Sequence, residues 1–183
     1  MTDREIIQGL INRDEKVTGE FFFKRCRPLF NYIISLVFSY EVEYDEFVNE
    51  LYVYLMANDG AKLRGFDYRG TMYKWLKIVA IRFFIKKRGR MIEDQSHETL
   101  NYERGTESDA SDSSAESDIH RLLQLMPNKR YAHVIQHLIL DDEKAEEVAQ
   151  SMNITTANLY NIRRRAMAQL TQVALLDMKY GKK

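Results

Sequence analysis

The sequence predicts an all-α fold made of two small helical domains joined by an acidic flexible linker, with a helix-turn-helix as the C-terminal domain. The chain of 183 residues contains only two prolines and eight glycines, and it is rich in good helix formers. Apolar residues recur at helical spacing on both sides of its centre. The centre, residues 91–118, carries nine acidic residues, one basic residue and few apolar ones. Such a segment cannot offset the entropy of ordering, so we expect a disordered linker there.

The charges of the chain are segregated, although the formal net charge is zero. Residues 1–90 sum to +4, residues 91–118 to −8 and residues 119–183 to +4. Two basic modules, 1–90 and 119–183, would therefore flank the acidic linker. The overall isoelectric point says little about binding partners.

Composition and termini favour a cytoplasmic protein without membrane insertion. No apolar run approaches the roughly 18 residues of a membrane span, and the N-terminus MTDREIIQG is charged, unlike a signal peptide. The single cysteine, Cys26, cannot form an internal disulfide, which suits a reducing compartment.

The N-terminal module is expected to begin with amphipathic helices. Thr2 can cap a short first helix, and a second is predicted from Thr18 to Val37 with a kink at Pro28. The segment YDEFVNELYVYLMAND that follows is amphipathic, with an outer face that we call the acidic ridge. The acidic ridge consists of Asp45, Glu46, Asn49 and Glu50. Such a face is usually only solvated, but it could dock on a basic partner surface.

Residues 62–90 combine ten basic residues and one acid with interleaved aromatic rings. Basic residues that follow a backbone while aromatic rings stack on unpaired bases are typical of single-strand binding. Much of the aromatic content is instead expected in the core, because the segment carries two apolar stripes. One stripe is Met72, Trp75, Leu76, Val79 and Phe83, and the other is Ile78, Ile81 and Ile85. Within this segment, the 65–70 loop and the first helical turn hold the best candidates for base contacts.

Residues 141–170 predict two helices joined by a tight turn. Val148, Ala149 and Met152 form the inner face of the first helix, and Asn153 tolerates the left-handed backbone of a sharp turn. Thr155 or Thr156 can cap the second helix.

The second helix of this pair separates into two faces at 100° per residue. The apolar face is Leu159, Ile162, Ala166, Leu170 and Val173, and the opposite face carries Asn161 and Arg164. Asn pairs with adenine and Arg with guanine in the major groove, so the pattern favours a DNA-reading helix-turn-helix over an ordinary helical hairpin with a solvated basic face. The candidates for DNA contact are Thr156, Asn158, Tyr160, Asn161, Arg164 and Arg165.

Five motifs resemble those of bacterial sigma factors and follow the same order along the chain. RGTMYKWLKIVA (69–80) resembles the RG-S/T-F-x-x-W-L-x-x-I-A signature of the DNA-melting domain, and DEFVNELYVYL (45–55) is similar to its D-L-V-Q-E-x-F-L helix. MPNKR, EEVAQSMNIT and NLYNIRRRAMAQL are similar to the promoter-reading domain. The ordered pair of modules resembles an extracytoplasmic-function (ECF) sigma factor over nearly the whole chain. Arg82, Lys86 and Arg163 depart from the family pattern. These departures leave the class of protein unchanged but bear on which promoter sequence it would recognise.

The resemblance implies a transcription initiation factor rather than an enzyme, without metal or cofactor. The acidic ridge would dock on the clamp of the largest subunit of core RNA polymerase, and the C-terminal helix would read promoter DNA near −35. A second set of residues would bind an unstacked base and hold the opened DNA strand near −10. This set is Phe66, Tyr68, Arg69, Tyr73, Lys74 and Lys77. Many relatives are held by an anti-sigma factor, so such a partner is also expected.

Two other functions are compatible with the sequence. A stand-alone helix-turn-helix regulator, or an anti-sigma-like or decoy protein, would use the N-terminal module only for protein contacts. His133 and His137 stand four residues apart like a metal pair, but no HExxH motif and no third ligand is expected near them. The chain also has no phosphate-cradling glycine loop and no nucleophile elbow.

Overall fold

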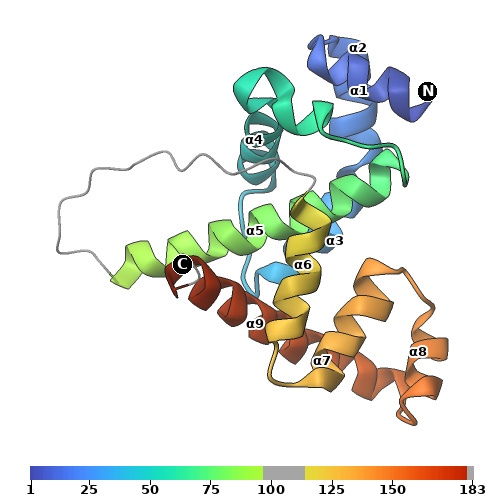
Figure 1. The fold of residues 1–183 in the computed structure, drawn as a ribbon, viewed down its shortest axis with the longest axis vertical. Coiled ribbons are helices and arrows are strands. Elements are labelled where there is room, and N and C mark those ends of the chain that lie inside the picture. The colour runs from blue at the N-terminus through green and yellow to red at the C-terminus, as the bar shows by residue number, and fades with distance from the viewer. Residues whose placement is uncertain (97–113, 181–183) are drawn as a thin grey trace.

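The computed structural model describes residues 1–96 and 114–180, and every regular element in these two ranges is helical (Figure 1). Most of the predicted acidic linker, residues 97–113, lies outside the described residues. Residues 91–96 and 114–118, at its two ends, are helical. No helix of the described ranges is both long enough and apolar enough to cross a membrane.

The N-terminal helices are α1 (Asp3–Ile11), α2 (Glu15–Val17), the π-helical segment η1 (Thr18–Arg25), α3 (Arg27–Val37) and α4 (Tyr44–Arg64). Thr2 caps α1 as predicted: its hydroxyl accepts from the Glu5 backbone, and the Glu5 carboxylate accepts from the Thr2 backbone. This reciprocal pair satisfies two backbone donors that the first turn of a helix leaves free.

Pro28 begins a helix rather than kinking one. The predicted helix over 18–37 is divided, because η1 ends at Arg25 and α3 begins at Arg27 with Pro28 in its first turn. Proline has no backbone N–H and a fixed φ, so it fits the first turn, where the N–H would be free in any case. Both segments bury a phenylalanine, Phe22 in η1 and Phe30 in α3, and the two ring centroids lie 4.9 Å apart.

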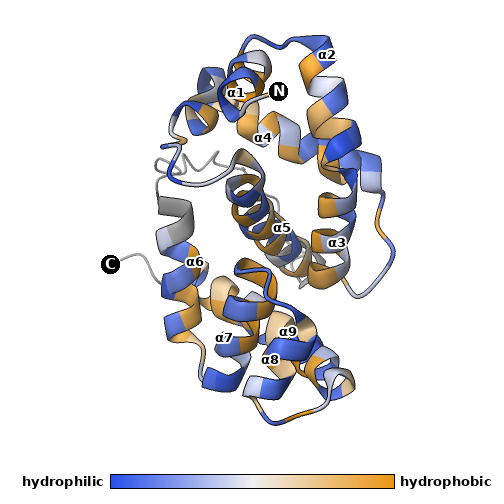
Figure 2. Ribbon diagram, turned by 90° about the vertical axis from the view of Figure 1, so that its right-hand side faces the viewer, coloured by the Kyte–Doolittle hydropathy of each residue, from blue (hydrophilic) through white to orange (hydrophobic). Residues whose placement is uncertain are grey.

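Helix α5 (Met72–Ser96) lies between two groups of helices. Figure 2 shows the N-terminal helices on one side of α5 and the C-terminal helices on the other. The C-terminal helices are α6 (Ser114–Leu125), α7 (Lys129–Val134), the π-helical segment η2 (Ile135–Leu140), α8 (Ala145–Ser151) and α9 (Thr156–Tyr180). Both apolar stripes predicted for α5 are therefore explained, since a helix that is apolar on two sides is covered on two sides.

One continuous hydrophobic core runs through both groups of helices. It joins Phe22, Leu51 and Leu76 to Leu122, Ile139 and Leu170 without a gap. A smaller cluster supports only α7, α8 and the start of α9. It consists of Val134, Val148, Ala149, Leu159 and Ile162.

Candidate nucleic-acid interface

Helices α8 and α9 are joined by a turn whose backbone is closed by hydrogen bonds. Asn153 has φ of 54°, the left-handed conformation predicted for it. The Asn153 N–H donates to the Gln150 carbonyl, and the Ile154 N–H donates to the Ala149 carbonyl, each at 3.0 Å. This is the Schellman arrangement, which satisfies the free carbonyls at the end of a helix. The hydroxyl of Thr155 then accepts from the Asn158 N–H at 3.2 Å and starts α9, so Thr155 rather than Thr156 is the cap.

The first turns of α9 present the predicted polar face to solvent. Leu159, Ile162 and Ala166 are buried beneath it, as the helical projection predicts. Thr156 is half-buried, Tyr160 is 46% exposed, and the remaining candidates are exposed. Those exposed candidates are Asn158, Asn161, Arg164 and Arg165. The Asn and Arg side chains on this short helical surface are therefore exposed to solvent and lie close together.

Arg163 contacts another part of the protein. Its guanidinium carbon lies 4.9 Å from the Tyr160 ring centroid and 6.0 Å from that of Tyr32 in α3. Burial raises the pKa of Tyr32, and the neighbouring Arg163 cation opposes that shift. Arg163 is half-buried at the border between the apolar and polar faces of α9.

An open hollow of about 330 Å³ lies beside α8 and is lined by Lys129, Arg130, His133 and Met152. Lys129 and Arg130 are exposed at the start of α7, where Asn128 caps the helix by accepting from the Arg130 and Tyr131 N–H groups. Sequence reasoning did not identify this basic hollow. In the sequence, only the dipeptide Lys129-Arg130 indicates a basic site. Met152 comes near these residues only when α7 packs against α8.

The second predicted set of DNA contacts lies in the 65–71 loop and the start of α5, and its members differ in exposure. Phe66 is 5% exposed and packs against Trp75 at 5.7 Å and Tyr68 at 4.8 Å between ring centroids. Tyr68 is 53% exposed and has φ of 59°, an uncommon conformation for an aromatic residue. Phe66 therefore supports the loop from below, while the ring of Tyr68 is presented to solvent.

Arg69 is held at the surface of this loop by Asp67. The Asp67 carboxylate accepts from the Arg69 backbone at 3.1 Å and from Arg69 Nε at 2.5 Å. These contacts, the backbone one first, lower the pKa of Asp67. Tyr73 and Lys74, in the first turn of α5, are also exposed.

Lys77, like Phe66, is a predicted DNA contact that the structure buries, and its side chain is only 2% exposed. Its Nζ donates to the Leu140 carbonyl at 3.2 Å and to Asp142 Oδ2 at 2.5 Å. In this arrangement Lys77 joins α5 to the loop before α8 and is closed to nucleic acid.

The acidic ridge lies along the first turns of α4. Asp45, Glu46 and Asn49 are exposed, whereas Glu50 is half-buried and accepts from Lys87 Nζ at 2.6 Å. The same ammonium lies 4.2 Å from the ring centroid of Phe47. Three members of the ridge are therefore available to a partner, and Glu50 is engaged within the protein.

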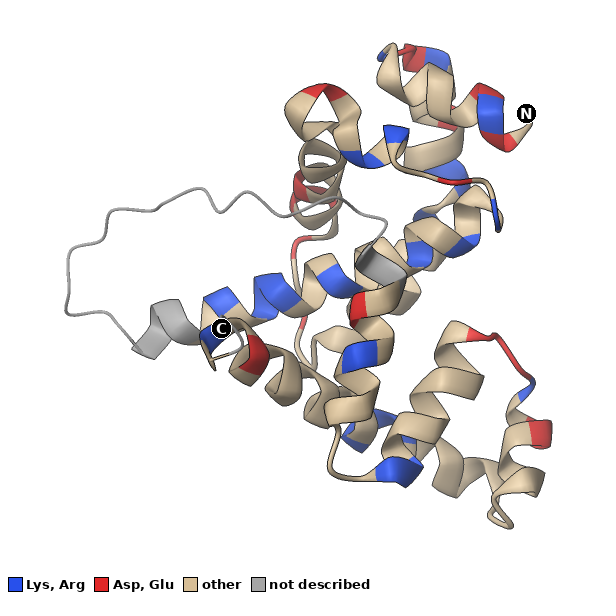
Figure 3. Ribbon diagram, viewed as in Figure 1, with Lys and Arg blue, Asp and Glu red and all other residues tan. Residues whose placement is uncertain are grey.

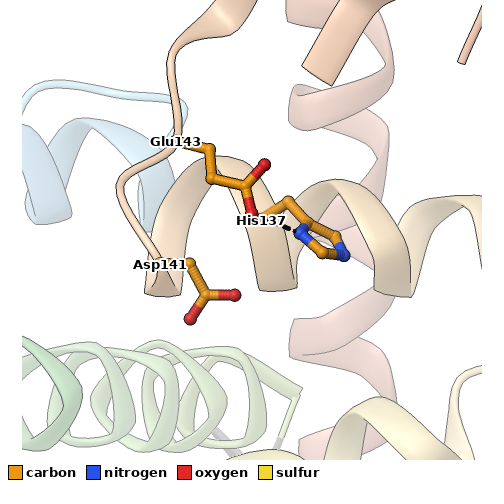
Figure 4. Close-up of side chains that lie close together, drawn as sticks. All are labelled: His137, Asp141 and Glu143. Atoms are coloured by element: carbon orange, nitrogen blue, oxygen red, sulfur yellow. Dashed lines mark hydrogen bonds and ion pairs between the residues drawn. The ribbon is translucent and has the colours of Figure 1, made fainter. Parts of the chain in front are cut away.

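His137 has two carboxylates near it, contrary to the expectation that no third metal ligand lies nearby. Ligand atoms of His137, Asp141 and Glu143 lie within 4.8 Å of one another (Figure 4). Glu143 Oε1 lies 2.7 Å from His137 Nδ1, and Asp141 accepts from Gln136 at 2.9 Å. These bonds account for the cluster without an ion. The His133 ring lies 4.1 Å from that of His137, and burial, followed by the charge of His137, lowers the pKa of His133.

Charges along α5 and around the C-terminal helices are unevenly placed (Figure 3). Lys and Arg recur along α5, and Asp and Glu occupy the loop before α8.

No model of a known protein family, no curated protein and no solved structure matches the chain.

Proposed function

We propose that the chain is a transcription initiation factor of the sigma type. It binds core RNA polymerase through the acidic ridge, reads promoter DNA near −35 with α9, and holds an opened strand near −10 with the 65–71 loop and the start of α5. No bond is made or broken by the protein itself, and binding energy drives strand separation, at a few kcal/mol for each unstacked base.

The observation that carries the proposal is the solvent-facing surface of the first turns of α9. Asn158, Asn161, Arg164 and Arg165 are exposed there, while Leu159 and Ile162 fix the helix on α8. In this proposal α8, the turn at Asn153 and α9 form a helix-turn-helix. The second helix of such a motif enters the major groove with its N-terminal residues on base edges. Each well-formed bidentate contact to a base contributes about 1–3 kcal/mol of discrimination.

Lys129 and Arg130 extend this surface. Phosphate contacts set the register of a protein on the duplex, and base contacts then specify the sequence. In this proposal the exposed cations of Lys129 and Arg130 take a backbone phosphate of the duplex, and Lys129 Nζ also donates to the Gln124 carbonyl at 2.6 Å. These cations support DNA binding by either a sigma factor or a stand-alone regulator.

The exposed rings of Tyr68 and Tyr73 support the strand-holding part of the proposal. They are 53% and 41% exposed and lie next to Arg69 and Lys74. Aromatic rings that stack on bases contribute about 1–3 kcal/mol per base, and neighbouring cations follow the backbone.

Purified protein mixed with bacterial core RNA polymerase tests the proposal. We expect the two to co-elute and the complex to start transcription at new, discrete sites on genomic fragments. DNA binding without polymerase binding would instead support the stand-alone regulator. Absence of both would reject both functions.

Charge reversal of the acidic ridge tests the docking surface. Asp45→Lys with Glu46→Lys should abolish co-elution and transcription. Both side chains are exposed, so the fold should persist, with a loss of at most about 2 kcal/mol of unfolding free energy because acids favour the first turn of a helix. Glu41→Lys, on the exposed segment before α4, is the matched control. Glu50 is unsuitable because its reversal also breaks the ion pair with Lys87. Transcription that survives the double reversal would remove the acidic ridge as the polymerase contact.

A further inference from the structure

Helix α5 uses one of its faces to hold the C-terminal helices. Arg82, Ile85 and Lys86 line a small cavity together with residues of α6 and α9. Gly89, one turn further, faces α9 so closely that an added Cβ would overlap Leu175 and lie 3.1 Å from Met178 Cε. Ile78 and Ile81 share this face at helical spacing and are 6% and 1% exposed. The second apolar stripe of α5 is thus the surface that receives the C-terminal helices.

An ion pair closes one end of this contact. Lys77 is buried, and among the described residues its Nζ donates to the Leu140 carbonyl and the Asp142 carboxylate. A buried ammonium without its counterion is strongly unfavourable. Asp142 itself is 70% exposed, so water reaches the carboxylate but not the ammonium.

The backbone around Asp142 aims its side chain at α5. Asp142 has φ of 56°, and the Asp141 and Glu143 N–H groups donate to carbonyls of η2 at 2.9 and 3.0 Å. Asp141 accepts from Gln136 and Glu143 from His137, both in η2, whereas Asp142 reaches Lys77. One acid of three in this loop therefore serves the contact with α5.

We propose that this arrangement is a closed, autoinhibited state that persists only while the buried ammonium of Lys77 keeps its counterion Asp142, and we call this ion pair the latch. The inference rests on the proposed function, because the latch occupies one of the proposed strand-holding residues. To act on a promoter, the C-terminal helices leave the face of α5 that carries Ile78, Ile81, Ile85 and Gly89. A phosphate of the opened strand then replaces Asp142 as the counterion of Lys77.

Distance makes the opening necessary. Positions −35 and −10 are about 25 base pairs apart, which at about 3.4 Å per base pair is roughly 85 Å. A compact chain of 183 residues has a radius of gyration of about 16 Å, or roughly 40 Å from side to side. In the closed state the helix of Lys77 touches the loop that leads into α8. The two reading surfaces therefore cannot reach both elements of one promoter until they separate.

Spin labels on the full chain measure the closure directly. Val53→Cys on α4 and Gln150→Cys on α8 place labels on exposed helical positions of the two groups. Cys26 need not be replaced, because it is buried and burial raises its pKa to about 12. Electron–electron distance measurements on the free protein should give one short, narrow distribution.

Two latch variants should move this distribution in opposite directions. Asp142→Asn keeps a residue that tolerates the left-handed backbone but removes the counterion, and we expect the open fraction to rise at least about tenfold. Lys77→Met keeps the apolar stem and removes the buried charge, so the short distance should persist or sharpen. Asp141→Asn and Lys74→Met, which make the same changes at exposed neighbours, should leave the distribution unchanged.

The latch is overturned if Asp142→Asn stays closed, or if Lys77→Met opens the protein as Asp142→Asn does. Far-ultraviolet circular dichroism of each variant separates opening from unfolding, because the opened protein keeps its helices.

Addition of core RNA polymerase tests the link to function. Polymerase should lengthen the distance in the wild-type chain and bind Asp142→Asn more tightly, since a protein that is already open bears no cost of opening. If the Asp142→Asn variant opens but polymerase does not bind any form, the proposed function fails and the latch stands. If polymerase binds and the free protein already shows the long distance, the latch fails and the function stands.

Discussion

Burial controls the chemistry of single residues in this protein, and Cys26 is the simplest case. Its side chain is fully buried between η1 and α3, and burial raises the pKa of the thiol to about 12. Because the thiolate is the reactive form, we expect native protein at pH 8 to be almost inert to a thiol reagent such as dithionitrobenzoate. Denaturant should expose one reactive thiol per chain, in keeping with the single cysteine. Rapid reaction of the folded chain would contradict the burial of Cys26.

Arg164 and Arg163 are adjacent but are expected to act differently. Arg164 is exposed, whereas Arg163 lies against Tyr32 and Tyr160. Arg164→Ala should weaken binding to the promoter fragments found by run-off transcription by about 1–3 kcal/mol and relax sequence choice at one position. Fluorescence anisotropy against matched and mismatched duplexes measures both effects.

The control for Arg164 is Lys179→Ala, an exposed cation at the far end of the same helix. It should change binding little on any sequence. Equal losses for Arg164→Ala on all sequences would make Arg164 a phosphate contact rather than a base contact.

At the scale of elements, the close approach of α5 and α9 depends on the missing side chain of Gly89. Gly89→Leu should lower the unfolding free energy by about 1–3 kcal/mol, because the added atoms overlap Leu175 and force the helices apart. Leu175→Ala should recover part of this loss, with a coupling energy of about 0.5–3 kcal/mol in a double-mutant cycle. Urea unfolding of the four proteins gives these values.

Gly19→Leu is the matched control, since an added Cβ at this helical glycine meets nothing within 4 Å. It should be neutral or stabilising by up to about 1 kcal/mol, because leucine forms helices better than glycine. Equal destabilisation by both substitutions would mean that the helical backbone, rather than the contact with α9, is sensitive to the change.

For the molecule as a whole, one continuous core predicts one cooperative unfolding transition. Trp75 reports on the N-terminal helices, and a fluorophore on Gln150→Cys reports on the C-terminal helices. Because the two groups share the core around α5, both probes should give the same urea midpoint. A lower midpoint at Gln150 would show that the C-terminal helices unfold independently.

Local patterns alone were enough to predict much of the fold. The helical class, the Thr2 cap, the left-handed Asn153 and the two faces of α9 all depend on residues within a few positions of one another. Short-range sterics, hydrogen bonds and helical periodicity determine such features. Pro28 shows where the local pattern was insufficient, because a proline ring suits a first helical turn as well as a kink, and in the structure it lies in the first turn of α3.

The sequence by itself determined that this protein is helical, that the four members of the acidic ridge share one helical face, and that α9 has a polar face of Asn and Arg. The tertiary structure decided that one of the four, Glu50, is half-buried and paired with Lys87. Only the tertiary structure decided that Phe66 and Lys77 are buried, that Arg163 contacts Tyr32, and that Lys129 and Arg130 border a hollow. The physical reason is sequence distance: Lys77 is buried against residues 63 and 65 positions away. A helix with two apolar stripes indicates that both sides will be covered, but which segment covers the second side is decided when the chain folds back on itself.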